Sequence, residues 1–562
     1  MSSFARMHSH FPNPIVEQHA NSDEADTTGP VRYIGNFHKT LPHDGSGHVS
    51  VGAYALLAAA ETARGYEAVP GGTSSADGMA SPLAGVANEA LGPHPLSLSM
   101  GPAPRVLGLS TAAEMVELQW MALLRDEPLH ALAGAAQVGC AIKDLNGAFA
   151  AAVADDPNSD PGKLQLGVDL PQQVGTLHLS PQTIFRCGLP GEDVGPFVSQ
   201  FLLLDAPFGT QTISQKQTPY AKGQQFLVTF AGWVHAQNSG HDAQGRNYEA
   251  SDAPKATGRR HIATMRDLAR FVHRDALHQA YFNACLILLS LAGGNPAAYL
   301  DPGNPYVGAG KLQRQKAFAS FGGPHILTLV SEVAARALKV VWHQKWRVHR
   351  RLRPEAYGGL LHVQNTAKST DYGLPDTAFA SKAAKLILGA NQSPLLPVPF
   401  PSGSPTHPAY GAGHATVAGA CVTILKAWFN EDATIPDPVE AQHHDDDAEG
   451  PDVPPKWSGA PLTVGGELNK VASNIAMGRT MAGVHWRSDN TRSLRLGEQI
   501  ATIMLARQMR DYVDRKSTSG SSDLAVPAQL TYTSFDGVPT TITPEGVFSG
   551  QAVTDGFYDR FL

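Results

Sequence analysis

Three short blocks of the sequence combine cationic and imidazole side chains with proline or glycine. They read KWRVHRRLRP at residues 345–354, SPTHPAYGAGH at 404–414 and GRTMAGVHWRSD at 478–489. Arginine offers a planar fork of N–H donors that can grip oxyanion oxygens in pairs, lysine adds a compact positive charge, and histidine can ligate a metal or transfer a proton. Pooled in one pocket, the three blocks predict a site that holds a tetrahedral or trigonal oxyanion.

The first block places two cations eight residues apart. The residues that lead into it, SEVAARALKVVWHQKWRVHRR, are rich in helix formers and contain no helix breaker before Pro354, so Lys345 is expected on a helix and Arg353 at its end. Eight residues correspond to about 80° around an ideal helix, so the two long side chains can converge on one point beyond it. Taken alone, the block has a second interpretation as a solvated basic face, because other arginines crowd the same segment.

In the second block a glycine loop precedes a helix. Gly411, Ala412 and Gly413 allow a tight turn, and a helix (HATVAGACVTILKAWF) is predicted to begin at His414. A helix N-terminus presents unpaired amide donors and the positive end of the helix dipole, which both favour an anion. His414 would face that anion from the first turn, and His407 lies seven residues earlier, close enough to support it. A single histidine at a helix start is more often a cap or a packing residue. The interpretation as an anion-binding site therefore depends on the glycine loop and not on the histidine alone.

The third block joins an arginine, a histidine and an aspartate. Arg479 lies between two glycines after a helix predicted at 469–477, and His485 follows six residues later. Asp489 can accept the proton of the His485 ring nitrogen that does not ligate, which would fix the tautomer, and it can also cap the next long helix. A helix break with a salt-bridged arginine would explain this block alone, but not three such blocks in one chain.

The composition narrows the class of protein. The chain has 562 residues, which allows either several domains or one large helical domain, and its formal net charge of -7 leaves no basic excess that would recruit nucleic acid or an anionic membrane. The basic pocket is therefore local. The four cysteines are scattered without metal-binding spacing and predict neither a disulfide framework nor a structural zinc site. They are Cys140, Cys187, Cys285 and Cys421.

No segment of the sequence has the pattern of an export signal or a membrane span. The N-terminus lacks a charged region followed by an apolar run, and the most apolar stretch, 284–292, is far shorter than the roughly 20 residues that cross a bilayer. We therefore expect a soluble, cytoplasmic protein with no membrane partner.

Helical periodicity dominates the chain. Apolar residues recur at three- and four-residue steps over 112–125, 131–154, 265–292 and 319–350, most strongly over 265–292. Residues 65–104 are rich in glycine, proline and serine and predict a long loop that wraps a neighbour or covers a site. The pattern favours an all-α protein built from helix bundles with long loops.

The organisation along the chain follows from these patterns. We expect a flexible N-terminal arm at 1–30, a single large helical domain at 31–515 that contains all three blocks, and a C-terminal tail at 516–562. Within the tail, residues 532–542 alternate around the turn dipeptide Asp536-Gly537 and predict a small β-hairpin.

Taken in order, the blocks resemble the signature of a known family. Lys-x7-Arg-Pro, Gly-His at a helix start and Arg-x5-His-x3-Asp are similar to the pattern of vanadium-dependent haloperoxidases, which are relatives of the type-2 acid phosphatases. The stretch SPTHPAYGAGHA resembles the bromoperoxidase branch of red algae and cyanobacteria because it contains His407. The seven-residue gap between Lys345 and Arg353 also matches that branch, whereas phosphatases typically have six residues there.

The resemblance implies an all-α fold of two packed four-helix bundles, with a vanadate cofactor held in one of them. His485 would bond vanadium axially as the metal ligand, His414 would act as the acid–base group, and His407 would support it and influence halide preference. The equatorial oxygens would be bound by Lys345, Arg353, Arg479 and the amide of Gly413, with Asp489 behind His485.

The chain departs from the family pattern at one position that matters. The family usually has serine two residues before His414, where its hydroxyl bonds an equatorial oxygen, but this chain has Ala412; Gly411 stands where proline is common. Loss of one hydrogen bond to a charged group costs roughly 1.5 to 3 kcal/mol. We therefore expect weaker vanadate binding or altered peroxide chemistry, but not loss of the site.

The function that the resemblance implies is the oxidation of bromide or iodide by hydrogen peroxide. The product, a hypohalous acid equivalent, would halogenate a small organic acceptor, and the protein would be a homo-oligomer, either a dimer or a dodecamer assembled from dimers. Two alternatives stay open. An acid phosphatase of the same superfamily would use His485 as a phosphorylated nucleophile, and a non-catalytic oxyanion-binding protein would fit the altered loop at Ala412.

Overall fold

The structure of the chain is a computed structural model. It describes residues 12–19, 23, 33–87, 92–155, 162–173, 176–248, 253–307, 312, 314–366, 371–443, 445–514, 529–550, 552–553 and 557–561. Most of the arm predicted at 1–30, and residues 516–528, 551, 554–556 and 562 of the predicted tail, lie outside these ranges.

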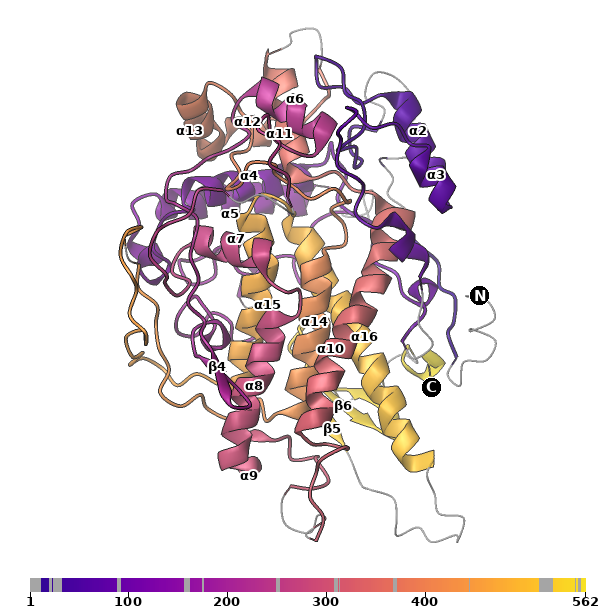
Figure 1. Cartoon of the computed structure of the whole chain (residues 1–562), viewed down its shortest axis with the longest axis vertical. Helices are drawn as coiled ribbons and strands as arrows, with labels where there is room; N and C mark the ends of the chain where they lie inside the picture. Colours follow the sequence, from indigo (N-terminus) through magenta and orange to yellow (C-terminus); the bar gives the residue numbers. More distant parts are fainter. Residues whose placement is uncertain are drawn as a thin grey trace.

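Four long helices form a central bundle (Figure 1). They are α10 (Gly323–His343), α14 (Gly413–Trp428), α15 (Val464–Met481) and α16 (Arg487–Asp514), and α14 contacts each of the other three. Helix α14 is buried along almost its entire length because it is made of small and apolar residues. It is therefore the core element around which the bundle packs.

Helices α14 and α16 touch through their backbones. A Cβ atom added to Gly419 would lie 2.0 Å from the carbonyl oxygen of Leu494, and one added to Gly497 would lie 2.1 Å from the carbonyl oxygen of Thr416. No side chain fits at either glycine. The two helices run parallel, so their N-terminal ends, which carry the second and third sequence blocks, lie side by side.

A second group of helices packs beside the bundle, as Figure 1 shows for α4 and α5. It contains α4 (Leu109–Leu123), α5 (Val138–Ala154), α12 (Thr377–Ala380) and α13 (Lys382–Asn391). The buried carboxylate of Glu117 on α4 accepts a hydrogen bond from Nε of Arg487 at 2.8 Å, which ties this group to the start of α16. The predicted all-α class is confirmed.

Shorter elements cover these two groups. Among the described residues the other α-helices are α2 (Val51–Ala59), α3 (Ala63–Glu67), α6 (Phe230–Ser239), α7 (Met265–Arg274), α8 (Gln279–Gly294), α9 (Pro296–Tyr299) and α11 (Pro354–Thr366). Two small hairpins pair β1 (Gln172–Gln173) with β2 (Thr176–Leu177) and β3 (Ala206–Phe208) with β4 (Gln211–Ile213).

The predicted C-terminal hairpin is confirmed and belongs to a larger sheet. Strands β5 (Leu530–Thr533) and β6 (Pro539–Thr543) pair antiparallel, with Leu530 opposite Ile542. Strands β7 (Gly546–Ser549) and β8 (Ala552–Val553) extend the sheet to four strands in the order β5-β6-β7-β8. Gly537 in the turn has a φ of 76°, a left-handed conformation that glycine adopts without strain.

One helix prediction is wrong. The periodic segment 265–292 is two helices, α7 and α8, which are bent by 98° at a break after Arg274. Asp275 caps α7 with an extended backbone, while the apolar pattern continues across the break. Periodicity alone therefore gave no sign of the corner.

Among the described residues, no single helix combines the length and apolar composition needed to cross a bilayer. The bent pair α7 and α8 passes that test only when its two helices are counted together.

The close approach of α14 and α16 predicts the effect of a single methyl group. We expect Gly497→Ala to lower the free energy of unfolding by about 1–3 kcal/mol, because the new Cβ forces the two helices apart. The control is Gly389→Ala in α13, where nothing lies within 4 Å of the added Cβ; that change should stabilise the helix by about 0.5–1 kcal/mol. Urea denaturation followed by circular dichroism measures both, and equal effects would contradict the backbone contact.

Candidate functional site

Lys345 lies on a π-helical turn that continues α10. This turn, η6 (Gln344–His349), ends where Arg350 adopts a left-handed φ of 41°. The fully buried Lys345 donates hydrogen bonds from Nζ to the carbonyl oxygens of Pro408 at 2.6 Å and Ala409 at 3.1 Å. Burial, together with the positive charge of Arg353, holds the pKa of Lys345 well below its ordinary value.

Arg353 does not end the helix that carries Lys345, so that part of the prediction is wrong. The helix stops at His349, and Arg353 instead immediately precedes α11. Its guanidinium donates to the carbonyl oxygens of His407 at 2.9 Å and Val484 at 2.6 Å. It also donates to ring nitrogens of His407 at 2.9 Å and His485 at 3.0 Å. Arg353 therefore joins all three sequence blocks.

His485 is held in one tautomer. Because a guanidinium only donates, Nε2 of His485 must accept the bond from Arg353, and the ring proton lies on Nδ1, which donates to Oδ2 of Asp489 at 3.0 Å. Burial, reinforced by the charge of Arg353, keeps the pKa of His485 well below its ordinary value. The result is a neutral imidazole whose lone pair on Nε2 points toward the cations.

Asp489 is itself held by an arginine that sequence reasoning missed. Arg351 donates from Nη1 to Oδ1 of Asp489 at 2.7 Å and from Nη2 to Glu114 at 2.9 Å, and all three side chains are buried. In the sequence, Arg351 is one of the arginines that crowd the first block and that a solvated basic face would explain. Its burial shows that it instead balances the charge of the carboxylate behind His485.

Arg479 reaches the site from the end of α15. Its Nη1 donates to the hydroxyl of Tyr248 at 2.5 Å and to the carbonyl oxygen of Val272 at 2.6 Å. Its Nε is buried and has no hydrogen-bond partner among the described residues. Tyr248 was not predicted, because it lies in a segment that carries no motif.

His414 pairs with a carboxylate from the unpredicted corner between α7 and α8. Its Nε2 lies 3.0 Å from Oδ1 of Asp275, and the side chain of His414 is 18% exposed whereas that of Asp275 is 4% exposed. Burial lowers the pKa of His414, and the charge of Asp275 acts in the opposite direction. His414 therefore keeps some access to solvent, as does the partly buried His407, whereas His485 is fully buried.

His407 lies beside Arg353 at the site. Among the described residues its ring contacts Arg353 and packs against Trp342, with ring centroids 4.9 Å apart. Its direct partner is therefore Arg353 rather than His414. Burial and the positive charges of Lys345 and Arg353 keep the pKa of His407 well below its ordinary value.

The glycine loop begins α14 as predicted. Ala412 is the N-cap, and its N–H donates to Oγ of Ser493 on α16 at 2.8 Å. A side chain at 411 would collide with that hydroxyl at 2.7 Å, which explains the glycine there. A Cβ at Gly413 would lie 3.0 Å from the ring of Trp342. The first turn of α14 therefore presents bare backbone to the site.

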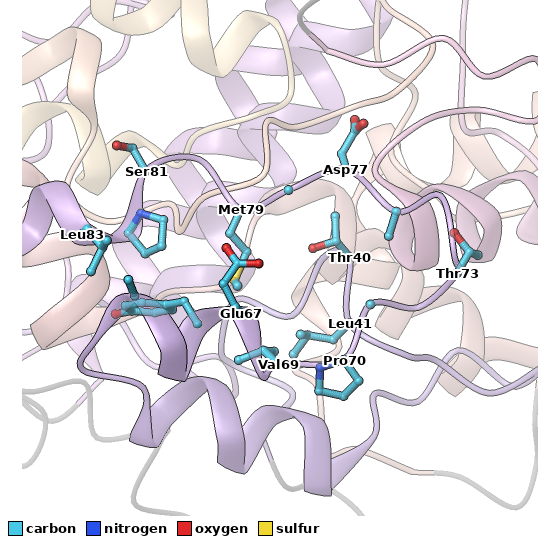
Figure 2. Close-up of a pocket in the computed structure, with 16 residues that line it drawn as sticks. Thr40, Leu41, Glu67, Val69, Pro70, Thr73, Asp77, Met79, Ser81 and Leu83 are labelled. Atoms are coloured by element: carbon cyan, nitrogen blue, oxygen red, sulfur yellow. The ribbon is translucent and has the colours of Figure 1, made fainter.

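The long loop predicted at 65–104 covers this region. The N–H of Ala80 donates to the carbonyl oxygen of Thr406 at 2.8 Å, and Nε1 of Trp342 donates to the carbonyl oxygen of Ala80 at 3.2 Å. The same loop lines a cavity of about 460 Å³ in which Glu67 and Met79 lie (Figure 2). None of the predicted site residues lines that cavity.

The three cations share one property that identifies the ligand class. Lys345, Arg353 and Arg479 are buried, yet among the described residues no carboxylate forms a salt bridge with any of them. A buried charge without a counterion is costly. A bound oxyanion would supply the missing charge, and the unpartnered Nε of Arg479 would supply a donor. The residues present therefore fit vanadate. Nε2 of His485, which here accepts a hydrogen bond from Arg353, would be the nitrogen offered to the metal.

Comparison with known proteins agrees with this geometry. Residues 325–514 match the family model described as the VCPO second helical-bundle domain. The chain is 37% identical to the vanadium-dependent bromoperoxidase of Corallina pilulifera over 76% of this chain and 75% of that protein. It is 34% identical to the vanadium-dependent bromoperoxidase of Ascophyllum nodosum over 88% and 87% of the two chains. The chain belongs to the vanadium-dependent bromoperoxidase family.

The fold of the family agrees as well. The second vanadate-dependent bromoperoxidase of Ascophyllum nodosum, whose structure is homohexameric, superposes with a TM-score of 0.78 at 27% identity. The match covers 98% of this chain and 90% of that one.

The support of His485 by Asp489 predicts a loss of vanadate affinity. We expect Asp489→Asn to weaken vanadate binding by about 10–100-fold, because the amide no longer fixes the proton on Nδ1. Equilibrium dialysis of vanadate measures the dissociation constant. The control is Asp536→Asn, which removes a carboxylate that pairs with Arg495 farther along the same helix at 2.5 Å. Unchanged affinity in Asp489→Asn would contradict the role of the carboxylate.

Proposed function

We propose that this chain is a vanadate-dependent bromoperoxidase that uses hydrogen peroxide to oxidise bromide or iodide. The observation that carries the proposal is a cluster of buried cations that, among the described residues, form no salt bridge with a carboxylate. They lie beside His485, whose Nε2 carries the lone pair and accepts a hydrogen bond from Arg353. Vanadate, when bound, supplies a Lewis-acid centre that activates peroxide toward a halide. The hypohalous acid produced would halogenate a small organic acceptor.

The residues of the site bind the cofactor and compensate charge. Lys345, Arg353, Arg479 and the amide of Gly413 would hold the oxygens of the vanadate, and Nε2 of His485 would be the nitrogen offered to the metal. The cations offset the negative charge that halide and peroxide bring into a buried pocket, where electrostatic interactions are stronger than in water.

His414 handles the proton that peroxide must lose. Burial lowers the pKa of His414, which favours the neutral ring, and with Nε2 paired with Asp275 the free Nδ1 can accept a proton. The Asp275 carboxylate then stabilises the imidazolium. His407, which is bonded to Arg353, positions that guanidinium and shapes the halide side of the pocket.

We also propose that the chain assembles as a homo-oligomer. The homohexameric Ascophyllum nodosum relative, which this chain matches along 98% of its length, supports this state. A dimer or a dodecamer of dimers, as the family resemblance implies, would give a different mass, and light scattering coupled to size-exclusion chromatography separates these assemblies.

A halogenation assay tests the proposed function. The purified chain, with and without added vanadate, is given peroxide, bromide and a phenolic acceptor, and a phosphate ester is offered in parallel. We expect vanadate-dependent bromination and no comparable ester cleavage. Ester cleavage without bromination would favour the phosphatase, and vanadate binding without either reaction would favour the non-catalytic oxyanion-binding protein.

The absent serine hydroxyl predicts a gain of affinity on restoring it. We expect Ala412→Ser to lower the dissociation constant of vanadate by about tenfold or more, because a hydrogen bond to a charged group contributes roughly 1.5–3 kcal/mol. Ala427→Ser, near the other end of α14, is the control and should leave the constant unchanged. If Ala412→Ser also leaves it unchanged, the hydroxyl does not reach the bound anion.

A further inference from the structure

Cys140 lies against a lysine from another helix. On α5, its Sγ accepts a hydrogen bond from Nζ of Lys382, the first residue of α13, at 2.8 Å. Cys140 is partly exposed, whereas Cys187, Cys285 and Cys421 are buried. Of the four thiols, only that of Cys140 therefore meets both solvent and an amine.

The pair is held in place by the packing of the two helices. The backbone N–H of Lys382 donates to Oδ2 of Asp144 at 2.9 Å, one turn after Cys140 on α5. Nε1 of Trp120 donates to the same oxygen at 3.1 Å. Asp144 therefore anchors the start of α13 on α5, and the lysine reaches the thiol without any movement of the helices.

The charges favour reaction at Cys140 over the other thiols. A neighbouring ammonium stabilises the thiolate, which is the nucleophilic form of cysteine. The hydrogen bond with Cys140 raises the pKa of Lys382. Burial raises the pKa of Cys187 to about 12, and it also raises the pKa of Cys285 and Cys421. These three thiols remain protonated at neutral pH and lack contact with solvent.

We propose that Cys140 and Lys382 form a modification site at which hypobromous acid closes a sulfenamide crosslink between α5 and α13. The proposal rests on the proposed function, because turnover supplies the oxidant. The Cys140 thiolate attacks bromine and releases hydroxide, which gives a sulfenyl bromide. The ammonium then loses the thiolate that stabilised it and gives up a proton, and the amine attacks sulfur and expels bromide.

The two reaction steps together conserve atoms and electrons. One thiol, one amine and one hypobromous acid give one S–N bond, one bromide, one proton and one water. Sulfur loses two electrons and bromine gains them. Hydrogen peroxide alone reaches the same bond more slowly through a sulfenic acid, which condenses with the amine and releases water.

The crosslink would join positions that are far apart in the sequence. It would fasten α13, which precedes the segment leading to His407, onto α5. A covalent link that closes so long a loop restricts the unfolded chain, as a disulfide does. An enzyme that releases an oxidant would in this way become more resistant to unfolding during its own turnover.

Peptide mapping by mass spectrometry tests the site. The purified chain is treated with one equivalent of reagent hypobromite, with no peroxide or vanadate, so that the result does not depend on enzyme activity. We expect a mass loss of about 2 Da, a linked peptide pair containing Cys140 and Lys382, and reversal by dithiothreitol. Cys140→Ser and Lys382→Gln should each abolish the link, whereas Lys385→Gln, which changes an exposed lysine on the same helix, should not.

Two outcomes would overturn the proposal. One is oxidation of Cys140 to the sulfinic or sulfonic acid with Lys382 unmodified. The other is a crosslink at Cys140 in the Lys382→Gln variant with the same yield as in the unsubstituted chain. A second arm repeats the mapping after turnover with vanadate, peroxide and bromide, where we expect the same link. A link with reagent hypobromite but none after turnover would support the Cys140–Lys382 chemistry and count against the proposed function.

Discussion

Three buried positive charges set the constraint that the rest of the site must satisfy. In a medium of low polarity each unpaired cation is costly, and the simplest remedy, a neighbouring carboxylate, would occupy the place of an anionic ligand. The chain solvates the cations with backbone carbonyl oxygens instead, from Pro408 and Ala409 for Lys345 and from Val272 for Arg479. These dipoles reduce the cost of burial and leave the net charge for the oxyanion.

Two carboxylates near the site contact its histidines and form no salt bridge with its three cations. Asp489 lies behind His485 and is neutralised by Arg351, and Asp275 lies behind His414. Each aspartate therefore acts through an imidazole, fixing a tautomer or stabilising a protonated ring, without competing for the cations. This separation of charge lets one pocket hold an anion and still move a proton.

Local sequence patterns pointed to Arg353, His407 and His485, three residues from separate blocks that contact one another in the structure. Each block combines a rare set of side chains with the end of a helix. Local signals also predicted a helix start at His414, a cap at Asp489 and the C-terminal hairpin. The helices begin at Gly413 and Arg487, so Asp489 lies in the first turn of α16 and does not precede it. The residues that were missed depend on contacts between distant segments. Asp275 lies at a corner hidden by continuous apolar periodicity, and Arg351 looks like its solvent-facing neighbours until its carboxylate partners are seen.

The glycine contact between α14 and α16 has a consequence for how such a site diversifies. Because main-chain atoms at Gly419 and Gly497 set the separation of the two helices, the spacing between the first turns is independent of the side chains that line the pocket. Residues such as Ala412 are then free to vary under selection while the framework keeps its dimensions. Substrate preference and cofactor affinity can drift across relatives one position at a time, with no compensating change in the scaffold.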